Sequence, residues 1–181
     1  MVFLIEEIME NPTEHANKMR KEIENLSEPQ RAKFIAWCIF YFTKDVDAMN
    51  FISNHVDKRI TKIARNLPYE LWDSKLDKFQ IKTLLDIISR TDWRHEDVAD
   101  KDEDASQGAL DLLASIQAGL QGLLDNSAAD ITDCAMNVSN RIDYLINFFG
   151  NPESDLEKEY TKQNNFISLL KSNSATLDWG R

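Results

Sequence analysis

Apolar residues recur three and four positions apart through almost the whole chain, and no segment holds a convincing alternation of apolar and polar residues. The first spacing places side chains on one face of an α-helix, whereas alternation is the pattern of a half-buried strand. Glycine and proline, which all-β folds need at their many turns, number only 5 and 4. A chain of 181 residues is also long enough to bury one core. The sequence therefore predicts an all-α, single-domain bundle of about seven or eight mostly antiparallel helices.

Capping residues divide the first half of the chain into helices. The segment "NPT" ends a short apolar N-terminal helix, and its Thr13 is expected to cap the next one. Ser27 and Gln30 have the spacing of a capping box at the start of a further helix. That helix, "RAKFIAWCIFYF", is apolar on nearly every side and is predicted to be the central buried helix. Asp45 is the expected cap of the helix after it.

Apolar stripes predict the remaining helices. One stripe extends to about residue 66, where "LPY" interrupts it, and a second stretch covers residues 70 to 90 with a possible break at Ser74. Two long helices follow, and "GNP" at 150–152 separates them from the last one. Residues 1–172 are expected to form the domain, and residues 173–181 a frayed tail in which only Trp179 can dock. The expected core positions of these helices are Met49, Ile52, Val56, Ile60, Ile63, Leu76, Phe79, Leu84, Leu85, Ile88, Leu112, Leu113, Ile116, Leu120, Leu123, Ile131, Cys134, Val138, Ile142, Leu145, Phe149, Leu156, Tyr160, Ile167 and Leu170.

The net charge of −10 is concentrated in one part of the chain. Residues 1–90 carry 14 acids and 14 Lys or Arg, whereas residues 92–133 carry 11 acids against only Arg94 and Lys101. The negative electrostatic field of such a segment repels phosphate backbones and anionic membranes and attracts basic proteins. We therefore expect neither direct nucleic-acid binding nor membrane binding. The apolar start "MVFLIEEIME" is too short and too acidic for a signal peptide, which favours a cytoplasmic location.

The densest acidic run, "EDVADKDED" at 96–104, allows three interpretations. It can be a solvated helix start, since acids are favoured there by the helix dipole. It can be a docking surface for a basic partner. It also places Asp100, Asp102, Asp104 and Asp111 at ligand positions of a calcium loop. However, Ala105 replaces the glycine of the sharp turn, and aspartate at the last position is too short to act as the usual bidentate ligand. We therefore expect no metal ligand set in this run.

No residue pattern predicts catalysis. The three histidines, His15, His55 and His95, do not fall into a zinc or di-iron helix motif, and no phosphate-binding or dinucleotide-binding glycine pattern is present. Cys38 and Cys134 each lie within an apolar helical stretch and are expected to be reduced core residues. The sequence therefore predicts a protein that is not an enzyme and needs no cofactor.

Two features suit an interaction surface. Gly108, Ser115 and Gly122 recur every seven residues, which permits close approach either by a partner or by a neighbouring helix of the same chain. Trp93, beside the acidic run in "TDWRHED", is either an anchor for a partner or a loop residue that folds back onto the core.

Three landmarks, "QRAKFIAWCIFYF", "EDASQGALDLLASIQAGLQGLL" and "NPESDLEKEYTKQNNFISLL", together resemble, in their order, the YjaG-like family of all-helical bacterial proteins. The resemblance spans most of the chain and implies a single helical domain without known enzymatic activity. It also provides the alternative function, a housekeeping helical protein that acts as a homodimer.

In size, acidity and lack of a catalytic motif, the chain also resembles the immunity proteins of bacterial contact-dependent growth inhibition systems. This resemblance implies that the chain is a monomer or weak homodimer that neutralises a basic toxin domain, a nuclease acting on RNA or DNA, by occluding its active site. The candidate partner-binding residues are Trp93, Glu96, Asp97, Asp100, Asp102, Glu103, Asp104 and Asp111.

Overall fold

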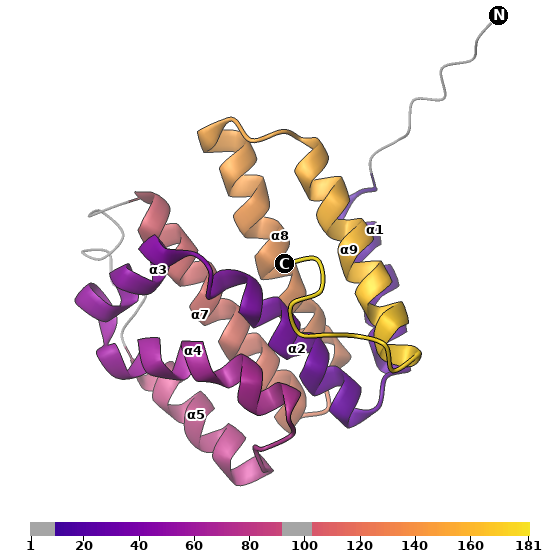
Figure 1. Cartoon of the computed structure of the whole chain (residues 1–181), viewed down its shortest axis with the longest axis horizontal. Helices are drawn as coiled ribbons and strands as arrows, with labels where there is room; N and C mark the ends of the chain where they lie inside the picture. Colours follow the sequence, from indigo (N-terminus) through magenta and orange to yellow (C-terminus); the bar gives the residue numbers. More distant parts are fainter. Residues whose placement is uncertain (1–9, 92–102) are drawn as a thin grey trace, which may run out of the picture.

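The computed structural model describes residues 10–91 and 103–181, which form eight α-helices and one π-helical turn and contain no β-strand (Figure 1). The all-α prediction is therefore confirmed. The helices are α1 (Pro12–Glu24), α2 (Glu28–Phe42), α3 (Val46–Phe51), α4 (Lys58–Trp72), α5 (Lys78–Arg90), α7 (Glu103–Leu124), α8 (Ala128–Phe149) and α9 (Ser154–Lys171), with the π-helical turn η1 (Ile52–Val56) between α3 and α4.

Helix α2 is the centre of the bundle, as predicted. All six residues from Phe34 to Ile39 are completely buried, because α2 packs against α4, α7, α8 and α9. Helices α7 and α8 lie side by side as a hairpin, with α1 and α9 next to each other at one flank and α3, α4 and α5 at the other (Figure 1). The core therefore surrounds an element with apolar residues on all sides, which is stable only as a buried helix.

Local hydrogen bonds explain why the first helices begin where they do. The Ser27–Gln30 capping box is formed, with the Ser27 main-chain N donating to Gln30 Oε1 at 3.0 Å. The Asp45 side chain accepts from the Ala48 main-chain N and caps α3, as predicted. The expected cap Thr13 is wrong by two positions, because Asn11 accepts from the main-chain N of Thr13 at 2.8 Å.

The predicted interruption at "LPY" is wrong. Helix α4 continues through Pro68, which lies on its buried face between Leu67 and Leu71. Burying this apolar face offsets the one main-chain hydrogen bond that proline cannot donate. The break lies earlier, at Asp57, whose extended backbone (φ −161°, ψ 129°) separates η1 from α4. Its carboxylate then caps α4 by accepting from the Arg59 main-chain N at 2.7 Å.

The possible break at Ser74 is confirmed. Ser74 has φ 54°, in the left-handed region that helices do not continue through, and α5 begins only at Lys78. Asp77 caps α5 in a second capping box, with Gln80. One predicted stretch is thus divided between the end of α4 and the whole of α5.

Most of the expected core residues are buried or partly buried, but two aromatic ones are not. Phe79 is 78% exposed because it lies in the first turn of α5, away from the buried stripe of Ile81, Leu85 and Ile88. Phe149 is 54% exposed because it is the last residue of α8, which Gly150 ends with a left-handed φ of 72°. Its helix end projects from the body of the molecule (Figure 1).

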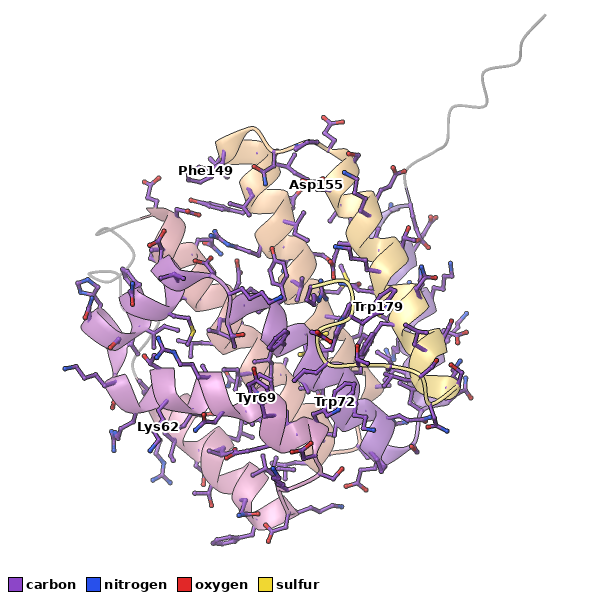
Figure 2. The ribbon with its side chains drawn as sticks, in the orientation of Figure 1. Lys62, Tyr69, Trp72, Phe149, Asp155 and Trp179 are labelled. Atoms are coloured by element: carbon purple, nitrogen blue, oxygen red, sulfur yellow. The ribbon has the colours of Figure 1, made fainter. Side chains whose placement is uncertain are left out.

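The tail is not frayed. It crosses α2, and the Nε1 of Trp37 donates to the main-chain O of Trp179 at 2.8 Å (Figure 2). The Trp179 ring also packs near the Phe166 ring of α9, with 6.0 Å between centroids. The expected docking of Trp179 is therefore confirmed. None of the helices in residues 10–91 and 103–181 has the length and hydropathy that crossing a membrane requires.

Candidate partner-binding surface

The eight residues proposed for partner binding fall in two groups. Five of the eight candidates, Trp93, Glu96, Asp97, Asp100 and Asp102, lie outside the described residues. The other three, Glu103, Asp104 and Asp111, lie in α7, and they have different surroundings. Glu103 is exposed at the first position of the helix, Asp104 is half-buried and Asp111 is buried.

Asp104 joins the start of α7 to two other helices through Arg141 of α8. Nη1 of Arg141 lies 2.7 Å from a carboxylate oxygen of Asp104, and Nη2 lies 3.0 Å from a carboxylate oxygen of Asp45, the cap of α3. Arg141 is only 4% exposed, so both ion pairs are shielded from solvent on its side. The last residue of the densest acidic run in the sequence is therefore held at a defined point of the fold.

Gly108 provides the space for this junction. A Cβ atom at Gly108 would lie 2.9 Å from Oδ2 of Asp45, 3.1 Å from Cβ of Ala48 and 3.2 Å from Cζ of Arg141. The close approach of α3 and α8 to the first turns of α7 thus depends on the absence of a side chain here.

The seven-residue repeat of small side chains is used within the chain. A Cβ at Gly122 would meet Ile131 and the main-chain O of Ser127, and the hydroxyl of Ser115 donates to the main-chain O of Cys134 at 2.9 Å. With Gly108, all three positions are buried. The interpretation in which a neighbouring helix covers them is therefore confirmed, and these residues are not on the surface.

Asp111 lies deeper along α7 than the other acids. It is 7% exposed and accepts a hydrogen bond from Nε2 of Gln107 at 3.0 Å. Burial raises the pKa of Asp111 from 3.8 to about 6, and the nearby Arg141 and the Gln107 amide offset only part of this shift. Its carboxylate therefore bears on stability, whereas contact with a partner requires an exposed group.

Three aromatic side chains form an exposed cluster at the end of α8, which we call the α8 aromatic cluster: Tyr144, Phe148 and Phe149. Phe148 is 71% exposed and Phe149 54%, and their ring centroids lie 4.8 and 5.9 Å from that of Tyr144. The guanidinium of Arg141 lies 5.6 Å from the Tyr144 ring centre, so the cluster is continuous with the Asp104 junction. The apolar stripe predicts Phe149 in the core, and this is wrong. The signal that indicates an exposed helix end is the pair Phe148 and Phe149 directly before the terminating glycine, with Tyr144 one turn earlier.

A second group of polar residues is buried between α1, α9 and the tail. His15 Nδ1 lies 3.2 Å from Glu10, and its Nε2 lies 2.8 Å from Oε1 of Gln163. The Gln163 amide donates to Glu159, which the guanidinium of Arg181 holds with two hydrogen bonds of 2.6 and 2.9 Å. His15 and Gln163 are 148 positions apart, so no local pattern could predict this chain of hydrogen bonds.

The cysteines and the carboxylates of one cleft are buried or ion-paired. Burial raises the pKa of the Cys38 thiol well above its usual value, and both cysteines are buried and unbridged, as expected. A cleft of about 380 Å³ opens beside the docked tail, but its carboxylates Asp155 and Glu159 are ion-paired with Lys158 and Arg181. Within residues 10–91 and 103–181, no cluster of His, Cys, Asp or Glu has the arrangement of a metal site.

Comparison with protein-family models, with curated proteins and with solved structures finds no match to this chain. The functional assignment therefore depends on the residues and their geometry alone.

Proposed function

We propose that this chain is an immunity protein that binds a basic toxin domain, a nuclease of a contact-dependent inhibition system, and occludes its active site. The observation that carries this proposal is the one-sided charge, with 11 acids against two basic residues between positions 92 and 133. A field of this kind speeds encounter with a basic partner and disfavours nucleic acid itself. The proposal assigns the chain no catalytic step and no cofactor.

The Asp104–Arg141–Asp45 junction supports the proposal because it fixes the point where the acidic run meets the fold. Asp104 is already held by the buried Arg141, so little conformational freedom of this side chain is lost on binding. Glu103, next to the junction, is exposed and has its charge available to a partner.

Partner kinetics test the proposal. Asp100, Asp102 and Glu103 are replaced together by Asn, Asn and Gln, and Asp104 is kept because it pairs with Arg141. The ligand is the basic C-terminal domain of the large secreted protein that we expect to be encoded beside this chain. Association at low salt should slow roughly tenfold or more, because the steering charge is lost. Added salt should slow the wild type and narrow the difference, since the Debye length falls to about 8 Å at physiological ionic strength.

A charge-matched control separates local from global effects. Glu14, Asp86 and Glu157 are exposed acids on α1, α5 and α9, and their replacement by amides removes the same net charge. This variant should associate at nearly the wild-type rate. Equal slowing of both variants would mean that net charge alone, and no particular surface, governs encounter. An unchanged rate in the first variant would contradict the docking role of the acidic run.

The alternative function is a housekeeping homodimer of the YjaG-like type. Sedimentation at micromolar concentration distinguishes it from the immunity function. The sequence feature that suggested a dimer interface is the repeat of Gly108, Ser115 and Gly122. In the structure, helices of the same chain cover these three positions. A stable dimer in sedimentation, together with the absence of a basic toxin gene nearby, would favour this alternative over the immunity function.

A further inference from the structure

We infer that the α8 aromatic cluster is the apolar anchor that inserts into a pocket of the basic partner. This inference rests on the proposed function and deepens it by naming the contact that holds the complex together. Acidic residues at a rim steer and select a partner, whereas fully buried aromatic side chains supply most of the residence time.

The cluster differs from the other exposed aromatic side chains. Phe79 on α5 has no ring neighbour among the described residues, and Tyr69 packs edge-on against Phe40 of its own chain. Phe148 and Phe149, by contrast, are mostly exposed and lie against Tyr144 at a helix end that projects from the bundle (Figure 2). A projecting group of adjacent rings fits the pocket-filling anchors of protein interfaces, and a scattered single ring needs no such explanation.

The charges around the cluster identify the chemistry of its occupant. Asp143 on α8, Glu153 after it, Glu103 on α7 and Asp47 on α3 are all exposed acids. Among the described residues, the basic side chains that follow or precede these acids are Lys44, which contacts the main-chain O of Arg181, Arg141, which is buried in its ion pairs, and Lys158, which is ion-paired with Asp155.

This arrangement selects against two other occupants. A second copy of the chain would bring two acidic rims together, and an anionic lipid surface would be repelled. The occupant that fits is a protein with an apolar pocket surrounded by Lys and Arg.

Site-specific crosslinking identifies what covers the cluster. The photoreactive residue p-benzoylphenylalanine is placed at Phe148 in one variant and at Phe79 in the control, in cells of the native host. Position 148 should crosslink to one basic protein, identified by mass spectrometry, and position 79 should not. No crosslink at 148 would overturn the inference, and a crosslink to a second copy of this chain would replace it with the homodimer.

The captured protein is then purified and titrated. Replacing Phe148 and Phe149 together by Ser should weaken its binding about 100-fold or more, mainly through faster dissociation. Phe79→Ser, a change of equal chemistry on α5, should bind like the wild type. The thermal midpoint should be nearly unchanged in both variants, because all three rings are mostly exposed.

The outcomes distinguish the two proposals. Wild-type affinity in the double serine variant, combined with slow association of the acidic-run variant, would overturn the anchor and leave the proposed function intact. If no basic protein binds the chain at all, both are overturned.

Discussion

At the scale of single residues, the burial of Asp111 makes the free energy of unfolding depend on pH. Its pKa of about 6 in the folded state is above the ordinary value of 3.8, so the folded state binds the proton more tightly than the unfolded state does. The free energy of unfolding should therefore fall as pH rises from about 4 to about 6, and stay at the lower value above that. The carboxylate should cost about 1–3 kcal/mol at neutral pH.

Asp111→Asn should remove this cost, since the amide is neutral and its oxygen can still accept from Gln107. The variant should be more stable than the wild type at pH 7.5 and close to it at pH 4, as measured by urea denaturation. An advantage of the same size at both pH values would show that the gain comes from packing and that ionisation of Asp111 has no part in it.

The pairing of single residues is the feature that the sequence predicts least well. Asp104 and Arg141 are 37 positions apart, and the pairing of an acid with an arginine at that separation leaves no periodic signal. From the sequence, Asp104 and Asp111 are both candidates for partner binding, whereas in the structure one is ion-paired and the other is buried. Only the fold of α8 against α7 brings the neutralising arginine to the acidic run.

At the scale of elements, the packing of α3, α7 and α8 depends on Gly108. Alanine favours a helix interior by about 1 kcal/mol over glycine. A Cβ at Gly108, however, would lie 2.9 Å from Asp45 and 3.2 Å from Arg141, whose positions are fixed by their mutual ion pair. We expect Gly108→Ala to destabilise the protein by about 1–3 kcal/mol in spite of its better helix propensity.

Denaturation of the Gly108→Ala variant measures this effect, and an Asp45→Asn, Gly108→Ala double variant serves as its control. The free energy of unfolding of the double variant should fall by less than the sum of the decreases in the two single variants, because both changes disturb the same junction. Stability of Gly108→Ala at or above the wild-type value would contradict the tight junction.

Helix existence was predictable because the apolar stripes are long and regular, and the boundaries were less so. "LPY" contains a residue that usually ends helices, but Pro68 stays within α4 because its face is buried. The sequence around Asp57 does not indicate a helix break, since an aspartate in a continuing apolar stripe is compatible with a helix as well as with a cap. Tertiary burial keeps Pro68 within α4, and that information is absent from a local window.

At the scale of the whole molecule, the docked tail closes the polar core. The side chain of Arg181 is 1% exposed and makes two hydrogen bonds to the side chain of Glu159, which is 2% exposed. Arg181→Ala would leave a buried carboxylate without its cation, which costs about 3–5 kcal/mol. We expect the free energy of unfolding to fall by this amount. Urea denaturation, monitored by tryptophan fluorescence, measures it.

A second variant shows whether the ion pair itself is the cause. Adding Glu159→Gln to Arg181→Ala removes the unpaired charge and should recover a large part of the loss. If the double variant is as unstable as the single one, the contribution of Arg181 is its stacking on Trp37, 3.5 Å from the ring centre.

The contact between Trp37 and Trp179 joins residues 142 positions apart, which has a consequence during protein synthesis. Ribosomes add about 5–20 residues per second, so roughly 7–28 s pass between the translation of α2 and that of the segment that covers it. Throughout this interval the central helix α2 lacks its final partners. We therefore expect the side of α2 that Trp179 covers to be open to chaperone binding until the tail segment has been translated.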